Sequence, residues 1–141
     1  FQIIHLCGKG KLDTSLTGID GYIQFEYIQK ELKDLFALTD IVISRAGANA
    51  ICELLALHKP NILIPLSASA SRGDQILNAR SFERQGFSIV IEEENLTDDL
   101  LLSEINRLYK DRESFISAMK NSDMQNSIET IINLIEKASS R

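Results

Sequence analysis

The chain has 141 residues, 44% of them hydrophobic, which is enough for one domain with a sizeable core. Its 15 Lys and Arg residues against 20 Asp and Glu residues give a net charge of -5, and no basic run could follow a phosphate backbone, so we expect no nucleic-acid partner. No apolar run approaches the roughly 20 residues that cross a bilayer. Two cysteines, Cys7 and Cys52, are too few for a disulfide framework or a zinc site, so we expect reduced thiols in a cytoplasmic protein.

The first segment, Phe1 to Cys7, already has the pattern of a buried strand, without a lead-in or an initiating Met. We therefore expect a piece of a longer polypeptide. Gly8-Lys9-Gly10 follows, where glycines permit positive φ and close approach of a ligand to the backbone. A plain turn after a strand is the simpler explanation of this short motif, which lacks the Ser or Thr and the upstream glycine of a P-loop.

A second strand is predicted over Tyr22 to Tyr27, and a helix follows it. The apolar residues of that helix recur at helical spacing along one face: Ile28, Leu32, Leu35 and Phe36.

The most informative stretch, Ile41 to Asn78, contains two copies of one arrangement, in which a short apolar strand leads through small residues into a helix. Ile41 to Ile43 is a β-branched run that suits a central parallel strand buried on both faces. In the loop from Ser44 to Asn49, Gly47 lies between two alanines and leaves the N–H groups at a helix start uncovered. Such a helix start receives anionic ligands.

The predicted helix continues to about Leu57, and Glu53 lies off its apolar stripe. Helical side chains lean towards the N-terminus, so this carboxylate can face the loop, where it could accept hydrogen bonds from the two hydroxyls of a ribose. The alternative, favoured when Glu53 is considered alone, is a surface residue whose charge favours the helix dipole. Arg45 either pairs with Glu53 or anchors the structure, and His58 follows the helix, where an imidazolium favours the dipole.

The second copy begins with the strand Ile62 to Ile64 and continues through a small-residue loop, Ser67 to Gly73. Asp74 is the expected N-cap of the next helix. On that helix Gln75 and Asn78 share a face near the loop, where two carboxamides suit hydroxyls and phosphate oxygens. An ordinary polar surface is the alternative.

The rest of the chain continues the alternation of strands and helices. Gly86 is expected to end the second helix, a last strand follows over Phe87 to Ile91, and Thr97 is expected to cap a further helix. A final helix is predicted from four isoleucines at helical spacing: Ile128, Ile131, Ile132 and Ile135. The order of elements predicts an α/β fold with a doubly wound, Rossmann-like parallel sheet.

Several sequence motifs between His5 and Gly86 resemble those of one family. Four motifs carry the resemblance: SRAGANAICELLALHKPNILIPL followed by SRGDQILNARSFERQG, with HLCGKG and FEYIQKELKDLFALTD upstream. Together they are similar to the C-terminal, donor-binding half of the MurG family of GT-B glycosyltransferases. That family transfers N-acetylglucosamine from UDP-N-acetylglucosamine to lipid I in peptidoglycan synthesis. The resemblance covers nearly the whole chain and implies one partial donor-binding domain over residues 1–141 that lacks its first strand.

The resemblance implies roles for the first loop and helix. Glu53 matches the acidic residue that holds the ribose of the UDP donor, and Gly47 and Ala48 match the backbone that faces the diphosphate and the sugar. Asn49 and Ala50 follow in the same loop and are expected near the sugar.

It also implies roles elsewhere. Gln75 and Asn78 match carboxamides that contact the sugar and nearby donor groups, and Ile28 matches the residue whose backbone reads the uracil. Cys7 and Gly8 fall beside the diphosphate.

The resemblance further implies what this chain does not carry. The lipid acceptor, the contact with the membrane and the proposed catalytic base belong to the other half of such an enzyme, so no catalytic residue is assigned here, and His5 and His58 receive no catalytic role. No Asp-x-Asp spacing occurs, which agrees with a metal-independent reaction without a cofactor. A separate donor-binding subunit with a membrane-bound partner subunit, and a non-catalytic nucleotide-binding module, are the two alternatives.

Overall fold

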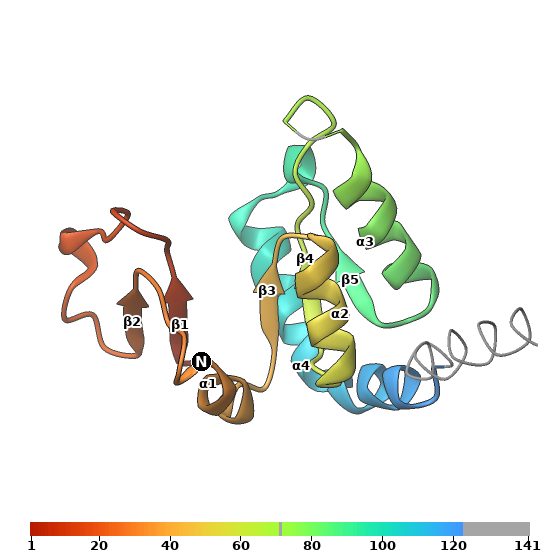
Figure 1. Cartoon of the computed structure of the whole chain (residues 1–141), viewed down its shortest axis with the longest axis horizontal. Helices are drawn as coiled ribbons and strands as arrows, with labels where there is room; N and C mark the ends of the chain where they lie inside the picture. Colours follow the sequence, from red (N-terminus) through yellow and green to blue (C-terminus); the bar gives the residue numbers. More distant parts are fainter. Residues whose placement is uncertain (71, 123–141) are drawn as a thin grey trace, which may run out of the picture. The chain divides into compact units, whose positions relative to one another are not determined.

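The computed structural model describes residues 1–70 and 72–122 (Figure 1). The chain forms two compact units, Phe1–Thr39 and Asp40–Arg141. The helix predicted around Ile128 and Ile135 lies outside the described residues.

The first unit contains a two-stranded parallel sheet, in which β1 (Ile3–Leu6) pairs with β2 (Tyr22–Phe25). A short 3-10 helix, η1 (Thr14–Leu16), lies between the strands, and α1 (Leu32–Leu38) follows them. The strands were predicted in the right places, but β1 is not the buried strand that its sequence indicated, because all four of its residues are exposed. Among the described residues, each strand of this sheet pairs with one neighbour. The predicted helix begins at Leu32, so Ile28 precedes it.

The second unit contains a three-stranded parallel sheet in the order β3, β4, β5. These strands are β3 (Val42–Ser44), β4 (Asn61–Leu63) and β5 (Ser88–Val90). The central strand is β4, whose three residues are all buried. The prediction of a central strand at 41–43 was wrong for this sheet. Because β3 is an edge strand of this sheet, residue Ile43 is 45% exposed, whereas its register partner Ile62 is 0% exposed.

Helices pack on this sheet and supply most of the core. They are α2 (Ala48–Ala56), α3 (Asp74–Arg84) and α4 (Asp98–Lys120), and the short 3-10 helix η2 (Glu93–Asn95) precedes α4. In the view of Figure 1, α2 lies in front of the strands, α3 lies to their right and α4 passes behind them. Leu108 of α4 packs in a buried cluster with Ile62, Ile89 and Ile91. Thr97 is the N-cap of α4, as predicted, because its hydroxyl accepts the N–H of Leu100.

A buried polar pair joins β4 to β5 at their amino ends. The Ser88 hydroxyl donates to Asn61 Oδ1 at 2.6 Å, and the Asn61 amide donates to the Lys59 carbonyl at 2.8 Å. Asn61 and Ser88 are also register partners. Both side chains are therefore hydrogen-bonded although almost no solvent reaches them.

The helix α2 ends in a left-handed residue. His58 has φ of 50°, and its N–H donates to the Leu55 carbonyl, while the N–H of Lys59 donates to the Leu54 carbonyl. These are the two reversed hydrogen bonds of a Schellman motif, in which glycine usually takes the left-handed position. His58 therefore lies one residue beyond the C-cap in a conformation that side chains disfavour.

The helix α3 ends in the same motif with glycine at the equivalent position. Gly86 has φ of 75°, and its N–H donates to the Glu83 carbonyl. The predicted ending at Gly86 is thus confirmed. At the other end, the prediction of Asp74 as N-cap was wrong: the N-cap is Gly73 with φ of 84°, and Asp74 is the first helical residue. The left-handed backbone at this cap favours glycine over the aspartate predicted from side-chain capping.

Candidate functional site

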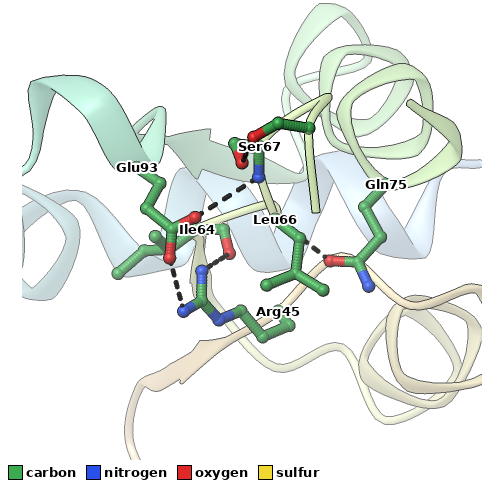
Figure 2. Close-up of polar contacts among 7 residues, drawn as sticks. Arg45, Ile64, Leu66, Ser67, Gln75 and Glu93 are labelled. Atoms are coloured by element: carbon green, nitrogen blue, oxygen red, sulfur yellow. Dashed lines mark hydrogen bonds and ion pairs between the residues drawn. The ribbon is translucent and has the colours of Figure 1, made fainter. Parts of the chain in front are cut away.

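The candidate site lies at one edge of the three-stranded sheet. Because β3, β4 and β5 are parallel, their carboxyl ends meet at the same edge, and the segments that leave them, 45–47, 64–67 and 91–93, lie there. Ligands of open α/β sheets bind outside the carboxyl ends of the strands. The polar contacts in Figure 2 join these three segments to one another and to the start of α3.

The loop after β3 leads into an uncapped helix. Gly47, the N-cap of α2, has φ of -66° and ψ of 139°, and no side chain caps the first turn. A Cβ built on Gly47 would meet no atom within 4 Å. Neither the backbone angles nor the packing of the described residues therefore requires glycine here, and the small residue keeps the N–H groups at the helix start accessible to an anion.

Glu53 lies on the exposed side of α2. Its carboxylate makes no hydrogen bond or ion pair with any residue of the described ranges. The predicted alternative in which Arg45 pairs with Glu53 does not hold, because Arg45 pairs with Glu93. The oxygens of Glu53 are thus open to hydroxyl donors.

The two carboxamides at the start of α3 bind the two loops. The Leu66 N–H donates to Gln75 Oε1 at 3.0 Å, and Asn78 Nδ2 donates to the Ala46 carbonyl at 3.2 Å. Each side chain thus uses one polar atom to hold a loop. Among the described residues no partner binds the other atom, Nε2 of Gln75 or Oδ1 of Asn78, so each carboxamide can present a second atom to a ligand.

Glu93, in the turn after β5, links the strand ends (Figure 2). Its Oε1 accepts from Arg45 Nη2 at 2.8 Å, and its Oε2 accepts from the Ser67 N–H at 3.3 Å. Arg45 Nη1 in turn donates to the Ile64 carbonyl at 3.2 Å. The hydrogen bond from Arg45, and then that from Ser67, lowers the pKa of Glu93. Sequence reasoning identified Arg45 as a possible anchor but missed Glu93, since a glutamate after a strand carries no motif.

Three predicted site residues lie in the first unit. Cys7 and Gly8 follow β1, and the Cys7 thiol donates to the Phe25 carbonyl at 3.4 Å. Gly8 has φ of 91°, which accounts for a glycine there. Ile28 is half-buried in the segment between β2 and α1.

Two classes of site receive no support in the described residues. No group of at least three His, Cys, Asp or Glu side chains within residues 1–70 and 72–122 could hold a metal ion. Over the same ranges, no helix has both the length and the apolar character needed to cross a membrane. Both cysteines are free thiols, and His5 is hydrogen-bonded to the Tyr22 hydroxyl at 2.8 Å.

The family model described as "Glycosyltransferase family 28 C-terminal domain" matches residues 1–135. The chain belongs to this family. The match confirms the family expected from the motifs between His5 and Gly86, and the parallel sheets with helices confirm the predicted α/β class.

Curated relatives of this family 28 domain are much longer than the chain. In Lachnospira eligens the relative is 62% identical over 136 residues, which are 96% of this chain and 38% of the relative. In Lachnoclostridium phytofermentans the identity is 64% over 137 residues, 97% of this chain and 39% of the relative. Both are named UDP-N-acetylglucosamine--N-acetylmuramyl-(pentapeptide) pyrophosphoryl-undecaprenol N-acetylglucosamine transferase. The chain thus spans about two fifths of their length.

Solved structures agree on the fold. The crystal structure of Acinetobacter baumannii MurG matches 97% of this chain and 41% of its own with a TM-score of 0.78 at 20% identity. The glycosyltransferase VinC, solved in complex with DTDP, matches 86% of this chain and 30% of its own with a TM-score of 0.63 at 20% identity. At this identity the likeness shows the fold of the family 28 domain and nothing finer.

Proposed function

We propose that the chain is the donor-binding domain of an inverting transferase that moves N-acetylglucosamine from UDP-N-acetylglucosamine to a pyrophosphoryl-undecaprenol-linked acceptor. The two curated relatives described above are named as an N-acetylglucosamine transferase of this kind, and both are longer than this chain. The single observation that carries the proposal is the open, uncapped start of α2 at Gly47, at the strand-end edge where ligands of such sheets bind.

In the proposed complex each part of the site has a different task. The N–H groups at the start of α2, from Ala48 to Ala50, face the diphosphate and stabilise its charge as the bond to the sugar breaks. Glu53 accepts the ribose hydroxyls, and Gln75 and Asn78 donate to and accept from the sugar with the atoms that hold no loop. Because preformed hydrogen bonds already place both carboxamides, little reorganisation accompanies donor binding.

The proposal assigns three further residues to the same donor: Cys7 and Gly8 beside the diphosphate, and the backbone of Ile28 at the uracil. The lipid acceptor, the catalytic base and the contact with the cytoplasmic face of the membrane belong to the acceptor half of the enzyme. We expect the isolated chain to bind UDP and to transfer no sugar. We also expect the reaction to need no metal ion.

Calorimetry tests the donor site. The chain is titrated with UDP and with pyrophosphate, as wild type, as Glu53→Ala, and as Asp111→Ala, which removes an exposed carboxylate of α4 as a control. Loss of a charged hydrogen-bond acceptor should weaken UDP about tenfold and pyrophosphate by less than about twofold. Asp111→Ala should bind both ligands like the wild type.

Two results would contradict the proposal. If the folded wild-type chain binds no UDP, the proposed donor site is wrong. If Glu53→Ala weakens the affinities for UDP and for pyrophosphate equally, Glu53 does not bind the ribose. Transfer of N-acetylglucosamine to a lipid acceptor by the complete gene product then separates a transferase from a non-catalytic nucleotide-binding module. The mass of that product separates one long chain from two subunits.

A further inference from the structure

The side chains of Arg45 and Glu93 form the outer part of a closed ring across the ends of β3, β4 and the turn after β5 (Figure 2). Arg45 binds the Ile64 carbonyl and Glu93, and Glu93 binds the Ser67 N–H. The backbone from Ile64 to Ser67 completes the ring. Three segments that are distant in sequence are thereby held at one edge.

This ring fixes two successive N–H groups of the loop after β4 from two sides. Glu93 accepts the N–H of Ser67, and Gln75 accepts the N–H of Leu66. A shift of the loop would break both hydrogen bonds, because the two N–H groups belong to adjacent residues. The position of Gln75 is therefore coupled to that of Glu93 through the backbone between Leu66 and Ser67.

Stability alone gives little reason for this ring. The side chains of Arg45 and Glu93 are 50% and 36% exposed, and ion pairs this exposed contribute little to stability because water and salt screen them. The neighbouring glutamates are arranged differently: Glu92 pairs with Arg80, and Glu94 is exposed with no partner among the described residues. Of the three consecutive glutamates, Glu93 is the one whose contacts reach the candidate site.

We propose that Glu93 is a positioning residue for the donor sugar, which acts through the loop after β4 to hold Gln75 in place. The inference rests on the proposed donor site and adds a residue that touches no ligand itself. Arg45 orients the carboxylate and serves the same purpose. In this arrangement its guanidinium is occupied by Glu93 and Ile64 and is not the group that receives the diphosphate.

The test uses the complete gene product with three variants: Glu93→Gln, Glu94→Gln and Gln75→Ala. A glutamine at 93 has one acceptor oxygen and no charge, so it cannot accept from Arg45 and Ser67 as the carboxylate does. Glu94→Gln removes the same charge from the next residue as a matched control. Thermal unfolding shows that each variant is folded, and dissociation constants are measured for UDP and UDP-N-acetylglucosamine, together with KM and kcat.

Glu93→Gln is expected to weaken UDP-N-acetylglucosamine about tenfold and UDP by less than about threefold, with the loss in KM larger than that in kcat. Glu94→Gln should match the wild type. In a Gln75→Ala background, Glu93→Gln should cause less than about a twofold further loss, because the group that it positions is already gone.

Other outcomes overturn the inference. If Glu93→Gln weakens the affinities for UDP and UDP-N-acetylglucosamine equally, Glu93 acts through its charge in general and does not position the sugar contact. If the losses of affinity in the double variant are additive, Glu93 does not act through Gln75. A wild-type protein that binds neither ligand would overturn the proposed donor site itself. A wild type that binds both, with Glu93→Gln unchanged, would overturn only the positioning role.

Discussion

Residues 42–58 and 61–86 repeat one order of strand, loop and helix and end both helices in the same motif, yet they use glycine at different points. At the helix start, Gly47 has an ordinary φ of -66° and Gly73 a left-handed φ of 84°. At the helix end, the left-handed residue is His58 in the first segment and Gly86 in the second. The second segment thus has glycine at both positions where its backbone is left-handed. In the first segment, Gly47 stands at a position where the backbone does not require glycine. A glycine that folding does not explain is the stronger indication of a ligand.

The largest difference between the two segments is in their strands. Ile43 and Ile62 are register partners, but only Ile62 lies in the buried cluster with Leu108. Ile62→Ala should lower the free energy of unfolding by about 3 kcal/mol, since it removes buried methyl groups and leaves a cavity. Ile43→Ala should lower it by less than about 1 kcal/mol. Guanidinium unfolding of both variants measures the difference, and similar losses would show that β3 is as well covered as β4.

The helix ends should differ next. Gly86→Ala places a side chain in the left-handed region and should lower the free energy of unfolding by about 1 to 2 kcal/mol. For the first segment the informative pair is His58→Gly against His58→Ala, because both remove the imidazole and its contacts. The glycine variant should be more stable than the alanine variant by about 1 kcal/mol in thermal or chemical unfolding. Equal stability of this pair would contradict the strain assigned to position 58.

Effects of opposite sign are expected at the helix starts. Serine is a better N-cap than glycine where φ is negative, so Gly47→Ser should raise the free energy of unfolding by about 0.3 kcal/mol. Gly73→Ser should lower it by about 1 kcal/mol, since serine must adopt a positive φ there. Calorimetry adds the functional half of this comparison: Gly47→Ser should weaken UDP about tenfold because its side chain covers the uncapped N–H groups. A Gly47→Ser variant with wild-type affinity for UDP would contradict the open helix start as the diphosphate site.

Much of the second unit could be predicted from its sequence because the signals are local. β-Branched runs marked the strands, the spacing of Leu and Ile marked the helices, and Thr97 and Gly86 marked helix ends where side-chain capping and glycine operate as expected. The exposure of β1 and the edge position of β3 were missed, since a strand's sequence does not reveal how many neighbours it has. The N-cap at Gly73 was missed because an adjacent aspartate gave the stronger capping signal.

The candidate site shows the same limit more strongly. The sequence placed Gln75 and Asn78 near the loop, and the structure adds that each already holds a backbone group there. The partner of Arg45 could not be found, because Glu93 is 48 residues away and only the pairing of three strands brings them together. Contacts with the donor at Glu53, Gly47 and the other predicted positions stay predictions.

The buried hydrogen bond between Asn61 and Ser88 has a consequence for how the sheet selects its alignment. A slip of one residue between parallel strands would turn each side chain of the moving strand to the opposite face. It would also leave the carboxamide and the hydroxyl without partners in a place where water does not reach them. Misaligned pairings of β4 and β5 are thus penalised twice, once because the shifted side chains no longer fit the helices packed on the sheet and once by unsatisfied polar atoms. The pair therefore favours the native register, in which the carboxyl ends of β4 and β5 are aligned and the loops after them begin at the same edge of the sheet.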